Sequence, residues 1–234
     1  MASSGPNTAA LVELYTSEGC SSCPPADRWL SGLASRGYVP GKVVPLALHV
    51  DYWDYIGWKD PYAKREFSLR QRKLTQLQRM ALVYTPQVLL QGRDFRGWGT
   101  PAFDQALAKI NAQPARARLS LQIQSLKSDG LAVNVRAEIL ERSQADDAGL
   151  YLAAYESRLE SRVSAGENRG RTLAHDHVVL EWQGPLPFSG ARLAEARVLP
   201  LLPGALAANS GVVGFVQNRR TAEVLQALML PSCP

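Results

Sequence analysis

Two cysteines, Cys20 and Cys23, are separated by two residues and follow an apolar segment over residues 11–16. A CxxC motif between a predicted strand and a predicted helix is typical of a redox-active pair. The first N–H groups of a helix have no partner within the helix, and the helix dipole is positive there, so a thiolate at Cys20 is stabilised. We therefore expect Cys20 to be the attacking sulfur and Cys23, one turn further in, to be the resolving sulfur.

Two prolines predict that the helix starts at the cysteines. Pro24 and Pro25 lack backbone N–H groups, which is tolerated in the first turn of a helix but not in its interior. The alternatives to a redox pair are a structural disulfide and half of a zinc site. A disulfide that closes so small a loop removes little unfolded-state entropy, and zinc requires further ligands that no second CxxC supplies. We therefore predict no metal ion and no bound cofactor.

The composition is ordinary for a globular protein, with 46% hydrophobic and 20% charged residues in a chain of 234. The sequence has no apolar run of eighteen residues, so we expect no transmembrane segment. Residues 1–10 lack the basic start and apolar centre of a secretory signal, although a trimmed signal with a new start would look the same. The net charge is +5, and the basic residues within 64–79 are spaced as the outer face of an amphipathic helix. We expect no specific nucleic-acid partner, because no binding motif is present.

The two halves of the chain differ in periodicity. Strand and helix patterns alternate in the first half, with expected strands at 11–16, 43–50 and 88–91 and expected helices at 24–36, 65–79 and 101–112. From residue 118 the apolar residues recur mainly at every second position, which is typical of strands with one buried face. We predict an α/β domain with a mainly parallel sheet over residues 1–114. An all-β antiparallel sandwich domain of about seven strands follows over residues 115–234.

Aromatic residues gather just beyond the second expected strand. Because parallel strands end at the same edge of a sheet, we expect this segment to lie beside the CxxC motif. The rings then either bind an unfolded peptide or an apolar small molecule, or merely cover the end of the sheet. The residues concerned are Tyr52, Trp53, Tyr55, Trp58 and Tyr62.

The second half offers fewer candidates for chemistry. His175 and His177 share one face of an extended segment, but no third ligand stands nearby, so we expect surface histidines rather than a copper or zinc site. Residues 166–171 are glycine-spaced without the lysine and hydroxyl of a phosphate loop, and we interpret them as a structured loop. Cys233, one residue from the end, is either a free tail thiol or a third redox sulfur.

The order strand, CxxC, helix and then Tyr84-Thr85-Pro86-Gln87 before a strand resembles the thioredoxin superfamily. The resemblance implies that the Thr85–Pro86 bond is cis and that both residues lie beside the CxxC, at the substrate. A cis bond before proline costs only ~0.5 to 1 kcal/mol, so this is physically accessible. The alternative is a trans proline that begins an edge strand.

A second resemblance extends over most of the chain. It rests on the strings VELYTSEGCSSCPPAD, ALHVDYWDYIGWKDPYA, VYTPQVLLQG, GENRGRTLAHDHVV and GVVGFVQ, which are similar to the family labelled domain of unknown function 1223. Membership implies a thioredoxin-like fold for the α/β domain and, as in many bacterial members, export. The resemblance therefore favours a periplasmic or secreted location, whereas a cytoplasmic location is expected if Met1 is the native start.

Glu13 is the remaining candidate. Many thioredoxins carry a buried aspartate six residues before the first cysteine, where this chain has Leu14. In a strand buried on both faces, the neighbouring Glu13 is a carboxylate in a low-dielectric site, suited to proton transfer. It could equally pair with an arginine.

These features predict a thiol–disulfide oxidoreductase that acts on a protein or small molecule bearing a disulfide or thiol. One alternative is a non-enzymatic two-domain binding protein, and a weaker one is a copper-handling chaperone that uses the same thiols. The predicted catalytic residues are Cys20, Cys23 and Glu13, and the predicted substrate-binding residues are Thr85, Pro86, Tyr52, Trp53 and Trp58.

Overall fold

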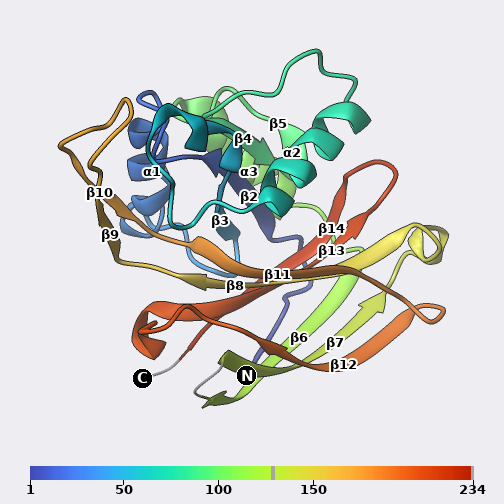
Figure 1. The fold of residues 1–234 in the computed structure, drawn as a ribbon. Coiled ribbons are helices and arrows are strands. Elements are labelled where there is room, and N and C mark those ends of the chain that lie inside the picture. The colour runs from blue at the N-terminus through green and yellow to red at the C-terminus, as the bar shows by residue number, and fades with distance from the viewer. Residues whose placement is uncertain (128–129, 233–234) are drawn as a thin grey trace.

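The computed structural model describes residues 1–127 and 130–232 (Figure 1). Within them, the strands form an eight-stranded mixed sheet, a four-stranded antiparallel sheet and a separate two-stranded hairpin. The order of the large sheet is β14-β13-β8-β11-β3-β2-β4-β5, so the earliest long strands lie in its interior.

Strands β2 (Ala10–Thr16) and β3 (Val43–His49) carry the site. They run parallel to each other, and every residue of both is buried, as expected for strands covered on both faces. On the other side of β2 lies β4 (Gln87–Leu90), which is antiparallel and is followed by the short edge strand β5 (Arg93–Asp94). The residues of β2 therefore alternate between two different cores.

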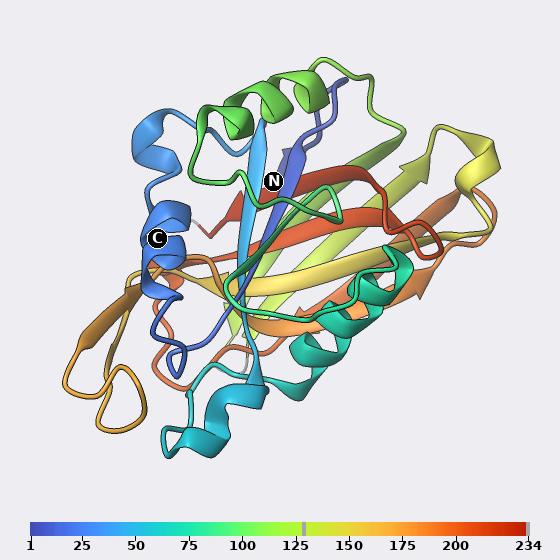
Figure 2. The same ribbon diagram turned by 90° about the horizontal axis from the view of Figure 1, so that it is seen from above.

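Helices cover both faces of this part of the sheet. Helices α1 (Pro24–Ser31) and α3 (Pro101–Asn111) pack on one face, against Val12 and Leu14 among others. Helix α2 (Arg65–Leu77) packs on the opposite face through Phe67 and Leu74. Figure 2 shows α1 and α2 on different sides of the sheet.

The four-stranded sheet supplies the other layer of the molecule. It packs against strands of the large sheet that belong to the second half of the chain, and an aliphatic core lies between the two sheets. The strands of the smaller sheet are β1 (Ala2–Ser3), β6 (Ala117–Lys127), β7 (Gly130–Ile139) and β12 (Arg192–Leu199). The strands that face them are β8 (Ala148–Glu156), β11 (Val178–Pro187), β13 (Ser210–Asn218) and β14 (Val224–Pro231).

A hairpin leaves the large sheet between β8 and β11 and returns to it. Its strands, β9 (Leu159–Arg162) and β10 (Thr172–His175), pair antiparallel and lie beside α1 (Figure 1). Four short 3₁₀ segments connect other elements of the described chain: η1 (Ala34–Arg36), η2 (Asp51–Ile56), η3 (Arg142–Gln144) and η4 (Ala207–Asn209).

The predicted fold class, a thioredoxin-like α/β domain followed by an all-β antiparallel sandwich domain, is wrong. Strand β3 is not the edge strand of a separate sheet formed by the first half of the chain, because β11 pairs with it in parallel. The Ala47 N–H of β3 donates to the carbonyl of His177 (2.8 Å). One predominantly antiparallel sheet therefore contains strands of both halves, and the expected mainly parallel sheet is absent from the described residues. Periodicity reports which faces of a strand are buried, not which strands pair. The division of the chain after residue 114 stays a prediction.

Candidate functional site

A disulfide between Cys20 and Cys23 lies at the start of α1. Cys23 is the N-cap of the helix and Pro24 and Pro25 occupy its first positions, as the sequence predicts. The Cα atoms of the two cysteines are 5.4 Å apart, and both residues are 0% exposed. Between them, Ser21 and Ser22 are exposed, and the Ser22 hydroxyl lies 3.3 Å from Cys20 Sγ.

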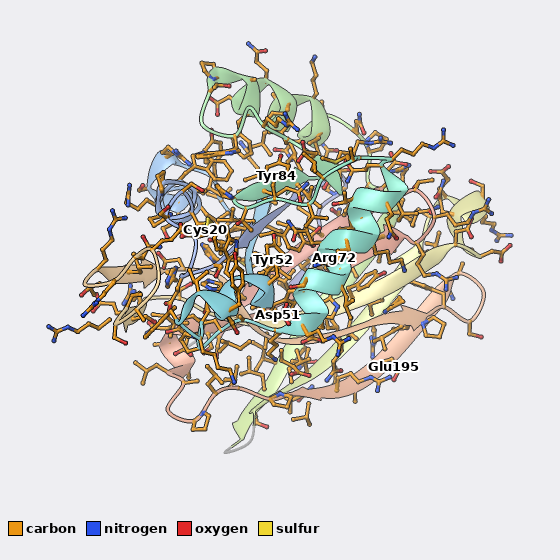
Figure 3. All side chains as sticks on the ribbon, turned by 45° about the horizontal axis from the view of Figure 1, so that its top comes forward. Cys20, Asp51, Tyr52, Arg72, Tyr84 and Glu195 are labelled. Atoms are coloured by element: carbon orange, nitrogen blue, oxygen red, sulfur yellow. A yellow bond between two sulfur atoms is a disulfide. The ribbon has the colours of Figure 1, made fainter. Side chains whose placement is uncertain are left out.

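The η2 segment packs against Gly19, next to the CxxC, while Figure 3 shows Tyr52 of the same segment near Arg72 of α2, whose guanidinium lies 5.9 Å from its ring. A Cβ atom on Gly19 would lie 3.0 Å from Cβ of Trp53, so glycine is required for this close packing. The Trp53 indole N–H donates to the Thr85 hydroxyl (2.7 Å), and the Thr85–Pro86 peptide bond is cis. Gly19, Trp53 and Thr85 therefore form a continuous row beside the disulfide.

The other aromatic residues of the segment diverge. Trp58 donates to Glu18 Oε2 (2.8 Å), directly before the CxxC. Tyr52 instead turns to α2, where its hydroxyl donates to Gln71 Oε1 (3.0 Å). Tyr55 is exposed and Tyr62 is buried. The structure thus brings Trp53 and Trp58 to Gly19 and Glu18, the two residues before Cys20, and directs Tyr52 to the helix on the other face.

Beneath the disulfide lies a buried group of carboxylates and imidazoles, which we call the acid–imidazole cluster: Glu18, Asp27, His49, Asp60 and His175. Each of these residues is less than a tenth exposed. Two imidazole–carboxylate contacts organise the cluster, His49 Nδ1 with Asp60 Oδ2 (2.7 Å) and His175 Nε2 with Glu18 Oε1 (3.1 Å). The two imidazole rings meet edge to face at 4.9 Å.

The cluster is tied directly to the CxxC segment. Asp60 Oδ2 also accepts a hydrogen bond from the backbone N–H of Glu18 (2.8 Å). Asp27 stands one helical turn after Cys23 on α1, and its Oδ1 accepts from the Thr16 hydroxyl (2.7 Å). An opening of about 170 Å³ between α1 and β10 reaches Asp27 and His175 from the surface.

Burial and charge act in opposite directions on the ionisable groups of the cluster. Burial raises the pKa of Asp27, which has no direct cationic partner. Burial alone would lower the pKa of His49, but the Asp60 carboxylate outweighs it and the pKa is raised. Burial would likewise raise the pKa of Asp60, yet His49 and the N–H donors of Glu18 and Tyr62 hold it below its ordinary value.

The loop of the β9–β10 hairpin covers the CxxC segment from outside. Asn168, which is 0% exposed, donates through Nδ2 to the carbonyls of Glu18 (2.8 Å) and Cys20 (3.0 Å). The neighbouring Glu167 accepts from the Ser21 N–H (3.0 Å), which lowers the pKa of Glu167. The site is therefore completed by residues that lie almost 150 positions further along the chain.

Glu13 lies outside this site. It projects from the opposite face of β2, where Arg70 of α2 binds both of its carboxylate oxygens (2.7 and 3.1 Å) and Tyr15 donates to one of them (3.3 Å). Arg70 in turn stacks over the rings of Tyr151, Trp182 and Phe215. Of the two interpretations of Glu13, its contacts correspond to the pairing with an arginine.

Sequence reasoning missed most of the residues around the cysteines. His175 was expected at the surface but is 3% exposed, because the hairpin turns it inward to Glu18. The helical spacing of Asp27 from Cys23 was an available signal, whereas the partners of His49 and the reach of Asn168 depend on tertiary structure. Cys233, the predicted possible third thiol, lies outside the described residues.

Residues 1–127 and 130–232 contain neither a candidate metal centre nor a membrane-spanning helix. No group of three or more His, Cys, Asp or Glu side chains there is arranged to hold a metal ion. None of the helices in the same residues is long and apolar enough to cross a membrane.

Fold and site together define a two-layer protein in which a mixed sheet carries a buried, helix-capping CxxC disulfide. The chain belongs to the family described as protein of unknown function (DUF1223), which matches residues 11–217. No curated protein sequence matches the chain.

Two solved structures are similar to this chain along nearly its whole length. A protein from Agrobacterium tumefaciens is 25% identical, with a TM-score of 0.73, and the match covers 98% of this chain and 97% of that one. HBP35 of Porphyromonas gingivalis is 14% identical, with a TM-score of 0.71, and the match covers 97% of this chain and 76% of that one. The second likeness shows the fold alone.

Proposed function

We propose that Cys20 and Cys23 form a thiol–disulfide exchange couple. The observation that carries the proposal is the position of the disulfide, which lies immediately before α1 with Cys23 as the N-cap of the helix. The positive end of the helix dipole stabilises a thiolate there. A disulfide that only stabilised the fold would gain little from closing a loop of this size.

The exchange takes place in two balanced steps. The thiolate of a partner dithiol attacks Cys20 Sγ, the Cys20–Cys23 bond breaks, and its electron pair passes to Cys23 Sγ, which takes up a proton. The second thiolate of the partner then attacks the mixed disulfide, which releases reduced Cys20 and leaves the partner oxidised. In the reverse direction Cys20 attacks a partner disulfide and Cys23 resolves it.

The partner binds to a surface beside the couple that is formed by Trp53, Trp58, Thr85 and Pro86. Their support is geometric, since Gly19 brings Trp53 against the CxxC segment and Trp53 holds Thr85. Glu13 has no part in the exchange, because it lies across the sheet in its pair with Arg70.

A trapping experiment tests the proposal. The reduced variants C23S and C20S, each also carrying C233S so that one cysteine remains, are incubated with glutathione disulfide, and the adducts are measured by mass spectrometry. C23S should accumulate a mixed disulfide on Cys20, whereas C20S should form its adduct at least about tenfold more slowly, because Cys23 is the N-cap of α1 and Cys20 precedes it in the loop. Absence of an adduct in both variants, each shown to be folded, contradicts an exchange couple and leaves a binding protein with a structural disulfide.

A further inference from the structure

The outer face of the four-stranded sheet carries an open hollow of about 430 Å³. This sheet is the layer farthest from the helices in Figure 1, so the hollow lies apart from the CxxC site. Its side chains come from β6, β7 and β12, on the face of each strand that is turned away from the aliphatic core between the two sheets. We call it the arginine hollow, and the residues that define it are Arg118, Ser120, Arg136, Glu138, Arg192 and Ala194.

The arginines of the hollow stand in two neighbouring rows across the sheet. In the first row, Glu138 of β7 lies opposite Arg118 of β6 on one side and opposite Arg192 of β12 on the other. Arg136 belongs to the next row, two residues from Glu138 on the same strand. Diagonal neighbours on an antiparallel sheet lie within ~7 to 8 Å of one another, so Arg136 is close to both of the other arginines. The three guanidinium groups can therefore reach one small ligand.

Small side chains beside Arg136 leave the hollow open. Its cross-strand neighbours are Ser120 of β6 and Ala194 of β12, and Ser3 of β1 continues the same row beyond Ser120. None of these side chains is long enough to cover the guanidinium groups. The two serine hydroxyls add hydrogen-bonding groups that suit a ligand rich in oxygen atoms.

Glu138 holds two of the arginines in place without neutralising the hollow. Its Oε1 accepts from Nε and Nη2 of Arg192 (3.1 and 3.0 Å), and its Oε2 accepts from Nη1 of Arg118 (3.2 Å). Arg136 makes no ion pair with Glu138 or with any other residue within 1–127 and 130–232. Three arginines and one glutamate leave the hollow with two positive charges in excess.

We propose that the arginine hollow binds a soluble small molecule through a phosphate group. A phosphate monoester carries a charge of about −1.5 to −2 at pH 7, which matches the two excess positive charges, and its three acceptor oxygens suit donors that approach from three strands. Guanidinium groups bind phosphate oxygens in a bidentate geometry. A carboxylate offers only one charge and two oxygens. The proposal is independent of the exchange couple, because the two sites share no residue.

Isothermal titration calorimetry of the full chain with phenyl phosphate tests the proposal. The buffer has low ionic strength, because salt screens exposed charges. Phenyl sulfate is the matched ligand, since it has the same ring but a single charge. R136Q removes the arginine that has no carboxylate partner, and R192Q removes one arginine of the other row. R162Q is the control variant, because it removes the same charge from an exposed position of β9.

We expect one site for phenyl phosphate, with a dissociation constant at least about fivefold lower than that for phenyl sulfate. R136Q and R192Q should each raise the dissociation constant of phenyl phosphate by roughly three- to tenfold, between the contribution of an exposed ion pair and that of a charge-assisted hydrogen bond. R162Q should change it by less than about twofold. The side chain of Arg192 is 82% exposed, so R192Q decides the question if R136Q does not fold.

Equal affinities for phenyl phosphate and phenyl sulfate, equal affinities of R136Q, R192Q and R162Q, or a lack of saturable binding overturn the proposal. Co-sedimentation with phosphatidylcholine vesicles that contain phosphatidic acid distinguishes a membrane surface from a soluble ligand. Vesicle binding that R136Q abolishes, in a protein that does not bind phenyl phosphate, would assign the hollow to a lipid headgroup and overturn the soluble ligand. All of these outcomes leave the exchange couple untouched.

Discussion

Asn168 holds the carbonyl of Cys20 through a side-chain hydrogen bond of 3.0 Å that joins residues 148 positions apart. The same amide group donates to the carbonyl of Glu18, and Oδ1 of Asn168 accepts from Arg171 (3.0 Å), so the side chain is fully engaged. The segment that enters the CxxC is thus fixed by the hairpin and not only by its own helix.

The first prediction is that N168D destabilises the oxidised protein by about 2 kcal/mol, within the range for a buried polar group whose partner is lost. The substitution turns a donor toward two carbonyl oxygens into an acceptor that repels them. Urea unfolding of the oxidised protein measures the free energy of unfolding. R169A, a change at an exposed neighbour, is the control and should lie within about 0.5 kcal/mol of wild type. Equal stability of N168D and R169A would contradict the assigned contacts.

The second prediction concerns the ion pair between Glu13 and Arg70, whose side chains are 0% and 9% exposed. R70M should lower the free energy of unfolding by about 3 to 5 kcal/mol, because it leaves a buried carboxylate without its cation. The double variant E13L/R70M should recover a large part of that loss, since it buries no charge. Denaturant unfolding of the three proteins checks this, and a double variant less stable than R70M would count against the account.

The local elements of this protein could be predicted from its sequence more fully than its topology. The prolines after Cys23 and the apolar run before Cys20 are local signals, and α1 and β2 lie where they indicate. The pairing of β3 with β11 has no such signal, because both strands are apolar and hydrogen bonds between backbones do not depend on side-chain identity. His49, Asp60 and Asn168 likewise acquire their partners only when distant segments meet.

The third prediction is a pH dependence of stability that arises from His49. Its pKa is raised in the folded state, so its stabilising contribution is complete below about pH 6.5, the unfolded value, and is lost as pH rises through the folded value. The pKa of Asp60 is lowered, so its contribution is present above about pH 3.9 and is lost as pH falls through the folded value. The pKa of Asp27 is raised, so its contribution to the free energy of unfolding also falls as pH rises, as that of His49 does.

We therefore expect His49 to make the free energy of unfolding larger at pH 6 than at pH 8.5, whereas His177, whose pKa is lowered by burial, acts in the opposite direction. The variant H49Q, which has no imidazole to titrate, should show a smaller difference between the two pH values, whatever its overall loss of stability. Urea unfolding of the oxidised proteins at both values supplies the measurement. A difference in H49Q as large as that in wild type would show that the His49–Asp60 pair is not its source.

The fourth prediction addresses the hydrogen bond from Trp53 to Thr85. T85V keeps the size of the side chain but removes the acceptor, and it should cost about 1 kcal/mol of stability, as for one net hydrogen bond. T85S retains the hydroxyl and is the control that should restore most of the loss. If urea unfolding shows T85V and T85S to be equally stable, the hydrogen bond from Trp53 to Thr85 contributes nothing to the free energy of unfolding.

The reduction potential of the Cys20–Cys23 couple tests the central claim most directly. The protein, carrying C233S, is equilibrated in glutathione buffers of graded potential, its free thiols are alkylated, and the reduced fraction is read by mass spectrometry with C23S/C233S as the reference for a single thiol. An exchange couple predicts a midpoint between roughly −120 and −270 mV and equilibration from both the oxidised and the reduced side. A disulfide that stays oxidised below roughly −300 mV and does not exchange would contradict the account and mark the bond as structural.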